Sequence, residues 1–120
     1  MYIIRRAVIP IVWVGTTLED LRAFPDDARA RAGYQLQRVQ MGQAPSDWKP
    51  MGTVGAGVFE IRIHTDREHR VFYVAKYEDG VYVLHAFEKR TRKTRAADIT
   101  LGRERFRQLP RLRARRGETQ

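Results

Sequence analysis

The sequence predicts an α+β fold of the order β-α-α-β-β-β-α, in which a curved, largely antiparallel sheet packs against a helical hairpin and a C-terminal helix. Three observations lead to it. An apolar strand pattern is followed by two helical patterns, three strand patterns follow a glycine-rich loop, and a helical pattern ends the chain. The 120 residues, 42% of them hydrophobic, suffice for one core and not for two. We therefore expect one domain over residues 1–110.

The first predicted element is a buried strand at 8–14, rich in β-branched residues. Because Arg5 and Arg6 precede it, a signal peptide has to be considered. The apolar stretch 7–14 contains Pro10 and is far shorter than the roughly 20 apolar residues that span a bilayer. It runs directly into a helix start and not into a cleavage region. We expect a core strand, no membrane association and a cytoplasmic location, and the absence of cysteine fits a reducing compartment.

Two helices are predicted after this strand. Thr16 and Glu19 have the spacing of a capping box, and the first helix ends before Pro25. Pro25 suits the first turn of the second helix, and Gly42 is a candidate C-cap. The second helix carries an apolar stripe at helical spacing, made of Ala28, Ala32, Leu36 and Val39. These features predict a helical hairpin packed on a sheet.

The remainder of the chain predicts a glycine-rich loop over 42–57, three strands and a helix. The loop includes residues 48–51, with Trp48 as a lid over the sheet edge or, on weaker grounds, a base-stacking platform. The strand at 59–63 alternates apolar residues with Glu60, Arg62 and His64, so these three are expected on a polar outer face. Strands at 71–77 and 81–87 are joined by an Asp-Gly turn. A helix follows, with Ile99, Phe106 and Leu109 on one face and Arg103, Arg105 and Arg107 on the other.

The net charge of +9 is concentrated at one end of the chain. Residues 1–88 contain 11 Lys/Arg and 11 Asp/Glu, whereas residues 89–120 contain 12 and 3. Arginine outnumbers lysine by 19 to 4, and a guanidinium binds phosphate through two parallel hydrogen bonds. The segment 89–116 therefore favours a polyanion partner over a solvated surface. For 111–116 alone both interpretations stay open, and residues 111–120 are expected to form a basic, disordered tail.

Several strings, in this order, resemble the RelE/HigB superfamily of toxins, and in particular its phage-derived HigB-like branch. They are 13–22 (WVGTTLEDLR), 32–36 (AGYQL), 47–51 (DWKPM), 60–63 (EIRI), 70–76 (RVFYVAK) and 83–94 (VLHAFEKRTRKT). The last string is the most specific, and the resemblance covers roughly residues 8 to 109. The family pattern often has Gln where Glu88 stands and Pro where Arg95 stands. A carboxylate at Glu88 is expected to weaken the attraction of Lys89 and Arg90 for phosphate.

The resemblance implies a toxin of a toxin–antitoxin system that cleaves mRNA on the ribosome. Its partners would be the ribosome, mRNA and a cognate antitoxin, usually of the helix-turn-helix type, and no cofactor is implied. The three histidines, His64, His69 and His85, lack the spacing of a metal site, so no metal is expected.

The candidate site residues combine this resemblance with local chemistry. Arg70 matches the arginine that in RelE-like toxins contacts the scissile phosphate; its alternative is a surface charge at an exposed strand end. Arg62, Lys89 and His85 are the other catalytic candidates. A salt bridge to Glu60 is the alternative for Arg62, and a hydrogen-bonded core histidine is the alternative for His85. Glu60 and Tyr73 are weaker candidates for a general base. The residues expected to bind phosphate are Arg90, Arg92 and Lys93.

Two other functions remain open at this point. One is a nucleic-acid-binding module that keeps the toxin fold without catalysis, and the other is a structural phage protein. A pure binder would lose RNA affinity and growth arrest together when Arg70 is replaced, whereas a toxin would separate the two. A structural protein would cause no toxicity and have no antitoxin gene beside it.

Overall fold

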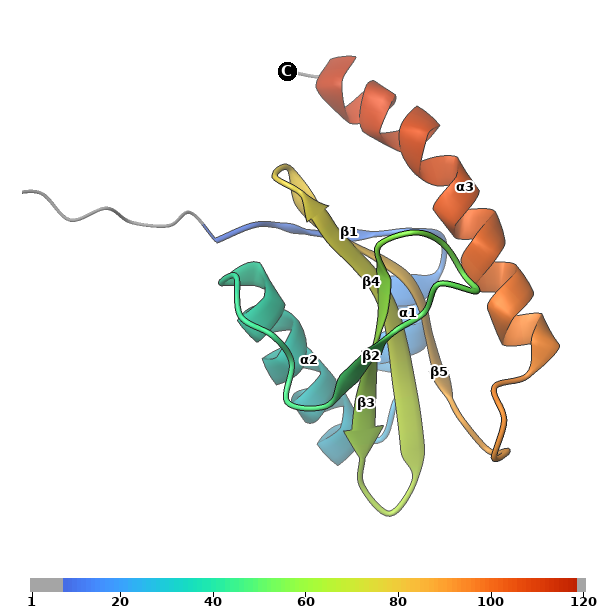
Figure 1. Ribbon diagram of the computed structural model, residues 1–120. Helices are drawn as coiled ribbons and strands as arrows, with labels where there is room; N and C mark the ends of the chain where they lie inside the picture. The colour runs from blue at the N-terminus through green and yellow to red at the C-terminus, as the bar shows by residue number, and fades with distance from the viewer. Residues whose placement is uncertain (1–7, 119–120) are drawn as a thin grey trace, which may run out of the picture.

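A five-stranded mixed sheet forms the centre of the protein (Figure 1). The computed structural model describes residues 8–118. Its elements are β1 (Ile11–Trp13), α1 (Thr17–Arg22), α2 (Asp26–Gln40), β2 (Trp48–Pro50), β3 (Val58–His64), β4 (Glu68–Tyr77), β5 (Gly80–Glu88) and α3 (Ala96–Glu118). The strand order is β1-β5-β4-β3-β2, with β1 parallel to β5 and the other pairs antiparallel. The predicted α+β class and C-terminal helix are confirmed.

Helices cover both faces of the sheet. α1 and α2 lie on one face, and α3 crosses the other (Figure 1). The predicted α2 stripe is confirmed, because its four residues are at most 5% exposed and pack against inward-facing residues of β3, β4 and β5. On the other face, Phe72 and Tyr82 pack with Leu109 of α3. We call these the α2 face and the α3 face of the sheet.

A β-bulge in β5 adjusts the α3 face. Phe72 lies opposite His85 and Tyr73 opposite Val83, so Leu84 is the extra residue. The bulge places both Leu84 and His85 on the α3 side, and the Leu84 carbonyl accepts a hydrogen bond from Arg105 at 3.0 Å. The backbone carbonyl of the bulged residue thus binds β5 to α3.

The buried side chain of Arg105 links α3 to the sheet and to the loop before α1. Besides Leu84, it donates to the Thr16 hydroxyl at 3.0 Å, and it is only 8% exposed. It packs against Gly15, whose φ of +61° favours glycine and where a Cβ would lie 2.8 Å from the arginine Nε. The sequence had placed Arg105 on the polar side of its helix, so this assignment was wrong.

Two local features differ from the sequence predictions, and a third agrees with them. Residues 48–50 form the edge strand β2 and not a loop, because Trp48, Lys49 and Pro50 pair with β3. The capping box does not form: the Thr16 hydroxyl bonds to the Asp20 carboxylate at 2.8 Å and caps no backbone N–H. The candidate C-cap Gly42 has a φ of +79° just after α2 and donates to the Val39 carbonyl at 3.0 Å, as a helix end requires.

The C-terminal segment also differs from the prediction. α3 continues to Glu118, so residues 111–118 are helical where a disordered tail was expected. Asp79 in the β4–β5 turn holds this end, with its carboxylate 3.3 Å from the Arg113 guanidinium and its carbonyl accepting from Arg116 at 3.0 Å. Tyr82 donates to the same carboxylate at 2.6 Å. Residues 119–120, like Arg5 and Arg6, lie outside the described residues.

Candidate nucleic-acid interface

A row of basic side chains crosses the α3 face of the sheet. The strand register pairs Lys49 with Glu60, Arg62 with Arg70, and Arg70 with Phe87. Lys89 follows β5, and its backbone N–H bonds to the Glu68 carbonyl at 2.7 Å, which extends the row onto the end of β4. We call Lys49, Arg62, Arg70 and Lys89 the basic row. Three of the four predicted catalytic candidates are thus brought together, and Lys49 was missed.

A buried carboxylate lies within the basic row. Glu60 is 0% exposed, and its Oε1 is 3.3 Å from Arg62 Nε and 3.7 Å from Arg70 Nε. Its other oxygen has no hydrogen-bond partner among residues 8–118. The expectation that Glu60 lies on an exposed outer face was therefore wrong, because the neighbouring cations and β4 enclose it. The alternative of a Glu60–Arg62 ion pair is confirmed.

Arg70 is held on two sides. It is 6% exposed, so it is not the exposed surface charge of the alternative interpretation. One guanidinium nitrogen donates to Glu68 at 2.9 Å and to the His69 carbonyl at 3.0 Å, while Nε faces Glu60. These contacts give the guanidinium one orientation before any ligand arrives.

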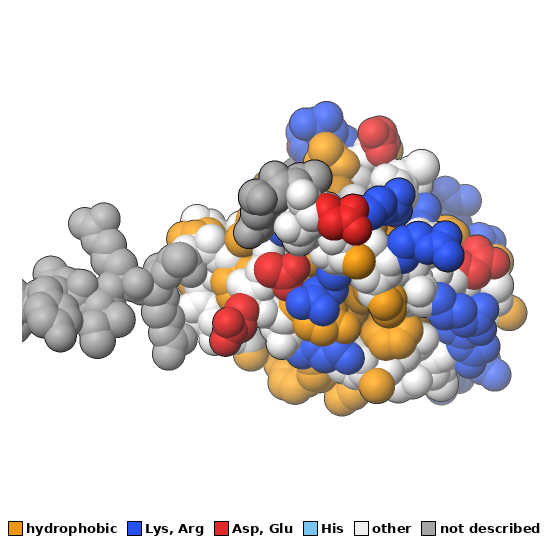
Figure 2. All heavy atoms as spheres, turned by 90° about the horizontal axis from the view of Figure 1, so that it is seen from above, with side chains coloured by type: hydrophobic (Ala, Val, Ile, Leu, Met, Phe, Trp, Pro, Cys, Tyr) orange, Lys and Arg blue, Asp and Glu red, His pale blue; other side chains and the backbone are white. Residues whose placement is uncertain are grey.

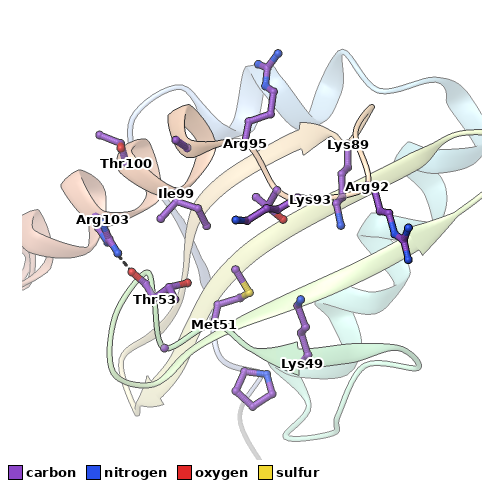
Figure 3. A pocket seen from close by; sticks show the side chains of 14 residues that line it. Lys49, Met51, Thr53, Lys89, Arg92, Lys93, Arg95, Ile99, Thr100 and Arg103 are labelled. Carbon is purple, nitrogen blue, oxygen red and sulfur yellow. Dashed lines mark hydrogen bonds between the residues drawn. The ribbon is translucent and has the colours of Figure 1, made fainter.

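The basic row runs into a groove of about 910 Å³ between β2 and the start of α3 (Figure 3). No acidic residue lines it, and Met51 and Ile99 provide an apolar floor. Lys49, Lys89 and Lys93 point into the groove from opposite walls in Figure 3, whereas Arg95 points away. Arg103 fixes one wall by donating to the Thr53 carbonyl at 2.5 Å. The cations that line the groove are Lys49, Lys89, Arg92, Lys93, Arg95 and Arg103.

Lys89 links the basic row to this groove. Partial burial and the charge of Arg70, with further repulsion from Lys49 and Arg62, lower the pKa of its ammonium, while Glu60 opposes the shift. A lysine crowded by like charges releases its proton more readily than an isolated one and gains most from a bound anion. The position therefore suits either phosphate binding or proton donation.

The predicted phosphate-binding residues divide between two environments. Arg92 and Lys93 are exposed in the groove, and neither makes an ion pair with any residue from 8 to 118. Arg90 instead pairs with Glu88 at 3.2 Å. Glu88, opposite His69 on the α2 side, also lies 3.7 Å from Arg67. The carboxylate of Glu88 thus acts on Arg90 and Arg67, and no contact joins it to Lys89.

His85 lies apart from the groove. Its Nε2 is 2.8 Å from an Asp98 oxygen, its ring stacks on Phe87 at 4.5 Å between centroids, and it is 6% exposed. Burial lowers the pKa of the imidazole, and the hydrogen bond to Asp98 opposes this only in part. The ring is therefore neutral near pH 7, donates from Nε2, and leaves its buried Nδ1 without a partner in the described part of the chain.

Two other candidates point away from the basic row. Tyr73 is buried in the core beneath α2, where burial raises the pKa of its phenol to about 12. Trp48 pairs with Ile61 and packs edge-on against Phe59, a residue of the α2-face cluster, so its ring lies on the side opposite Lys49. Neither side chain is placed to meet a ligand bound at Arg70.

Sequence reasoning missed Lys49 and Glu68 as parts of this surface, whereas Arg103 lies in the basic segment 89–116 that it assigned to a polyanion partner. Lys49 precedes a proline in a segment with no strand alternation, and the groove joins residues 49–53 to residues 89–103, which no sequence pattern connects. The charge excess after residue 88 was the available signal. Lys and Arg side chains gather along the side of the molecule that α3 occupies (Figure 2).

Comparison with protein families identifies the chain. Residues 19–107 match the family described as phage derived protein Gp49-like (DUF891). The chain belongs to this family. Gp49-like proteins are a RelE/HigB-like toxin family, so membership also implies an antitoxin partner. No curated protein matches the chain.

The Gp49-like match covers the basic row, the groove and α3 up to Arg107. Within residues 8–118, no helix is both long and apolar enough to cross a membrane. The same residues contain no group of three or more His, Asp or Glu side chains arranged to hold a metal ion.

Proposed function

We propose that this Gp49-like protein is a ribosome-dependent endoribonuclease that cleaves mRNA and so inhibits translation. One observation carries the proposal: the preoriented Arg70 lies in a basic row whose Lys49 and Lys89 also line a groove that has six cations and no acid. Single-stranded RNA fits such a surface because its backbone phosphates are exposed and flexible. The proposed partners are the ribosome, mRNA and a cognate helix-turn-helix antitoxin, in the cytoplasm.

The chemistry proposed is attack by a ribose 2′-oxygen on the adjacent phosphorus, with departure of the 5′-oxygen of the next nucleotide. The 2′-hydroxyl loses its proton, negative charge grows on the phosphorane oxygens, and the leaving oxygen takes up a proton. In this scheme Arg70 and Arg62 stabilise the phosphorane, because their guanidinium groups are oriented before the substrate binds. Glu60 accepts a hydrogen bond from Arg62, and Glu68 and the His69 carbonyl accept hydrogen bonds from Arg70. The ribosome supplies the alignment of the 2′-oxygen with the scissile bond.

Lys89 is the proton donor that this proposal favours. Burial and neighbouring cations lower the pKa of its ammonium, which brings proton release closer to neutral pH. His85 is the second candidate, and bound RNA would have to expose its ring, since it is buried against Phe87 and Asp98. Arg90, Arg92 and Lys93 are proposed to bind flanking phosphates, Arg90 after release from Glu88.

Replacement of Arg70 tests the proposal. We expect Arg70→Ala to abolish growth arrest on induction and to lower cleavage by at least about a hundredfold, the usual cost of one preorganised oxyanion partner. RNA affinity should fall only a few-fold, because the groove cations remain. The matched control is Arg29→Ala on α2, an exposed arginine paired with Asp26 on the far side of the sheet. Equal losses of affinity and toxicity would contradict the enzyme and indicate a binder.

A binding module without catalysis is the second candidate function. The burial of His85 favours this second function, because the His85 ring, bonded to Asp98 at the start of α3, is not open to a substrate in this conformation. It predicts that the wild-type protein binds RNA without producing new 5′ ends. A structural phage protein would do neither.

A further inference from the structure

A cluster of three side chains lies at the end of the sheet next to Arg70. His64 ends β3, and its Nε2 is 2.5 Å from Asp47 Oδ2 while its Nδ1 is 2.8 Å from Glu68 Oε1. That same Glu68 oxygen accepts from Arg70 at 2.9 Å. The three residues come from three places in the chain: the segment before β2, the last residue of β3 and the first residue of β4. Nothing in the proposed cleavage reaction uses them.

We propose that Asp47, His64 and Glu68 form a proton-operated positioning device for Arg70. With His64 protonated, its two N–H groups hold both carboxylates, and Glu68 is shared between the imidazolium and Arg70. When His64 loses its proton, the ring can donate to only one carboxylate. The remaining N–H stays on Nε2, which has the shorter contact, 2.5 Å to Asp47 against 2.8 Å from Nδ1 to Glu68. Glu68 then carries a charge that Arg70 alone must neutralise, and an incoming phosphate has to displace Glu68 from Arg70. The inference rests on the proposed phosphate-binding role of Arg70.

The surrounding charges support this reading. From α2, Arg31 reaches the backbone carbonyl of His64 and not its ring. On β3, Arg62 is directed to Glu60. The charges that act on the imidazole are thus those of Asp47 and Glu68, whose hydrogen bonds raise its pKa above 6.5 despite partial burial. The pKa of Glu68 is lowered, because the hydrogen bonds from His64 and Arg70 outweigh its desolvation.

His64 is separable from the other two histidines by pH. Burial is the first cause that lowers the pKa of both His69 and His85, so these rings titrate below 6.5. The midpoint of the His64 titration therefore lies at a higher pH than those of His69 and His85. The device predicts tighter phosphate binding on the acidic side of the His64 titration and weaker binding on the alkaline side.

Nuclear magnetic resonance of the full chain tests the coupling without RNA. The Arg70 Nε–H resonance should shift with the same midpoint as the His64 ring, above pH 6.5. In Glu68→Gln the two should separate, with the Arg70 resonance flat and the His64 midpoint lowered. Asp26→Asn, which removes a carboxylate on α2, is the charge-matched control and should keep the coupling. A flat Arg70 resonance in the wild-type chain, or one that still follows His64 in Glu68→Gln, overturns the inference.

Binding of a fluorescein-labelled single-stranded RNA tests the consequence. Between pH 6 and 8.5 the wild-type affinity should fall about twofold to threefold, the size expected of one exposed ion pair. His64→Gln should be weak and His64→Lys tight at both ends of this range, each without the pH step. A wild-type pH step that persists in both variants contradicts the device. No RNA binding at any pH, with the Arg70–His64 coupling intact, would instead overturn the proposed function.

Discussion

Glu60 is a carboxylate that the fold buries between cations, and its presence there has a physical cost. Removing a carboxylate from water costs free energy. The attraction of Arg62 and Arg70 offsets this cost, because both guanidinium groups lie within 4 Å of Glu60 Oε1. The second oxygen is buried and has no hydrogen-bond partner among the described residues. At the scale of the residue, Glu60 orients Arg62 through a hydrogen bond and balances the charge of Arg70.

Replacing Glu60 should therefore separate stability from RNA affinity. Glu60→Ala leaves two arginines and Lys89 without their carboxylate, so we expect a loss of about 3 kcal/mol in the free energy of unfolding. RNA affinity should rise, because the basic row gains one net positive charge. Urea denaturation and RNA titration measure the two effects. The exposed Glu104→Ala is the control, with a change within about 0.5 kcal/mol. Unchanged stability in Glu60→Ala would contradict the role assigned to this carboxylate.

At the scale of the element, α3 is attached to the sheet at two places. Near its centre Arg105 bonds to the bulged Leu84 and to Thr16, and near its end Arg113 and Arg116 bond to Asp79. Arg113 also stacks over the Tyr77 ring at 3.7 Å. Arg113 and Arg116, which the sequence assigned to a basic tail, thus bind the β4–β5 turn. Arg111 and Arg115 are exposed on the same helix.

Loss of Asp79 should release the end of α3. Asp79→Ala removes the carboxylate that accepts from Tyr82 and Arg113 and lies 4.0 Å from Arg116, although the backbone carbonyl that binds Arg116 remains. We therefore expect amide hydrogen exchange over residues 111–118 to accelerate at least tenfold while residues 99–109 stay protected. Glu78→Ala, the exposed neighbour in the same turn, is the control and should change neither segment. The Asp79 pKa is lowered by hydrogen bonds from Tyr82 and Arg113 that exceed its desolvation, so its stabilising contribution is present above the unfolded value of 3.8 and is lost in acid. Slow exchange in Asp79→Ala would show that other contacts hold the helix.

Periodic elements were predictable from sequence, and elements made by distant residues were not. The α2 stripe and the Asp-Gly hairpin follow from local spacing, so both appear as expected. The alternation of residues in β3 identified the two faces of the strand. It also led to the expectation that the polar face is exposed, because the sequence does not show that Arg62 and Arg70 enclose Glu60. β2 carries a proline and spans three residues, which is too little for a strand pattern. The C-terminal end of α3 is held by Asp79, which lies thirty-four residues before Arg113 in the chain, so no local pattern reveals the contact.

The site was predictable in the same unequal way. Resemblance led to Arg62, Arg70 and Lys89, which the sheet register places side by side. Resemblance could not lead to Lys49 or Glu68, because only the pairing of the strands brings Lys49 beside Glu60 and Glu68 beside Arg70 and His64. For His85 the sequence left two roles open, catalysis or a hydrogen-bonded place in the core. The hydrogen bond to Asp98 is the one that the core alternative requires, and the catalytic role stays a prediction.

At the scale of the whole molecule, the protein keeps its positive charge in one region. The basic row, the groove and α3 adjoin on one side of the sheet, while α2 on the other face carries both signs of charge. A single-sign surface of this kind attracts a polyanion from a distance and weakens with added salt. The Gp49-like chain thus combines a general attraction for polyanions with one arginine in a fixed orientation.

Mapping mRNA 5′ ends in a purified translation system tests the central claim most directly. The wild-type chain should produce new ends at ribosome-occupied codons, none when ribosomes are omitted, and none in Arg70→Ala, while Arg29→Ala should cut like the wild type. Cuts on free mRNA would contradict ribosome dependence. Intact mRNA in every lane, with RNA still bound by the basic row and groove, would contradict the enzyme and leave the surface as a binding site.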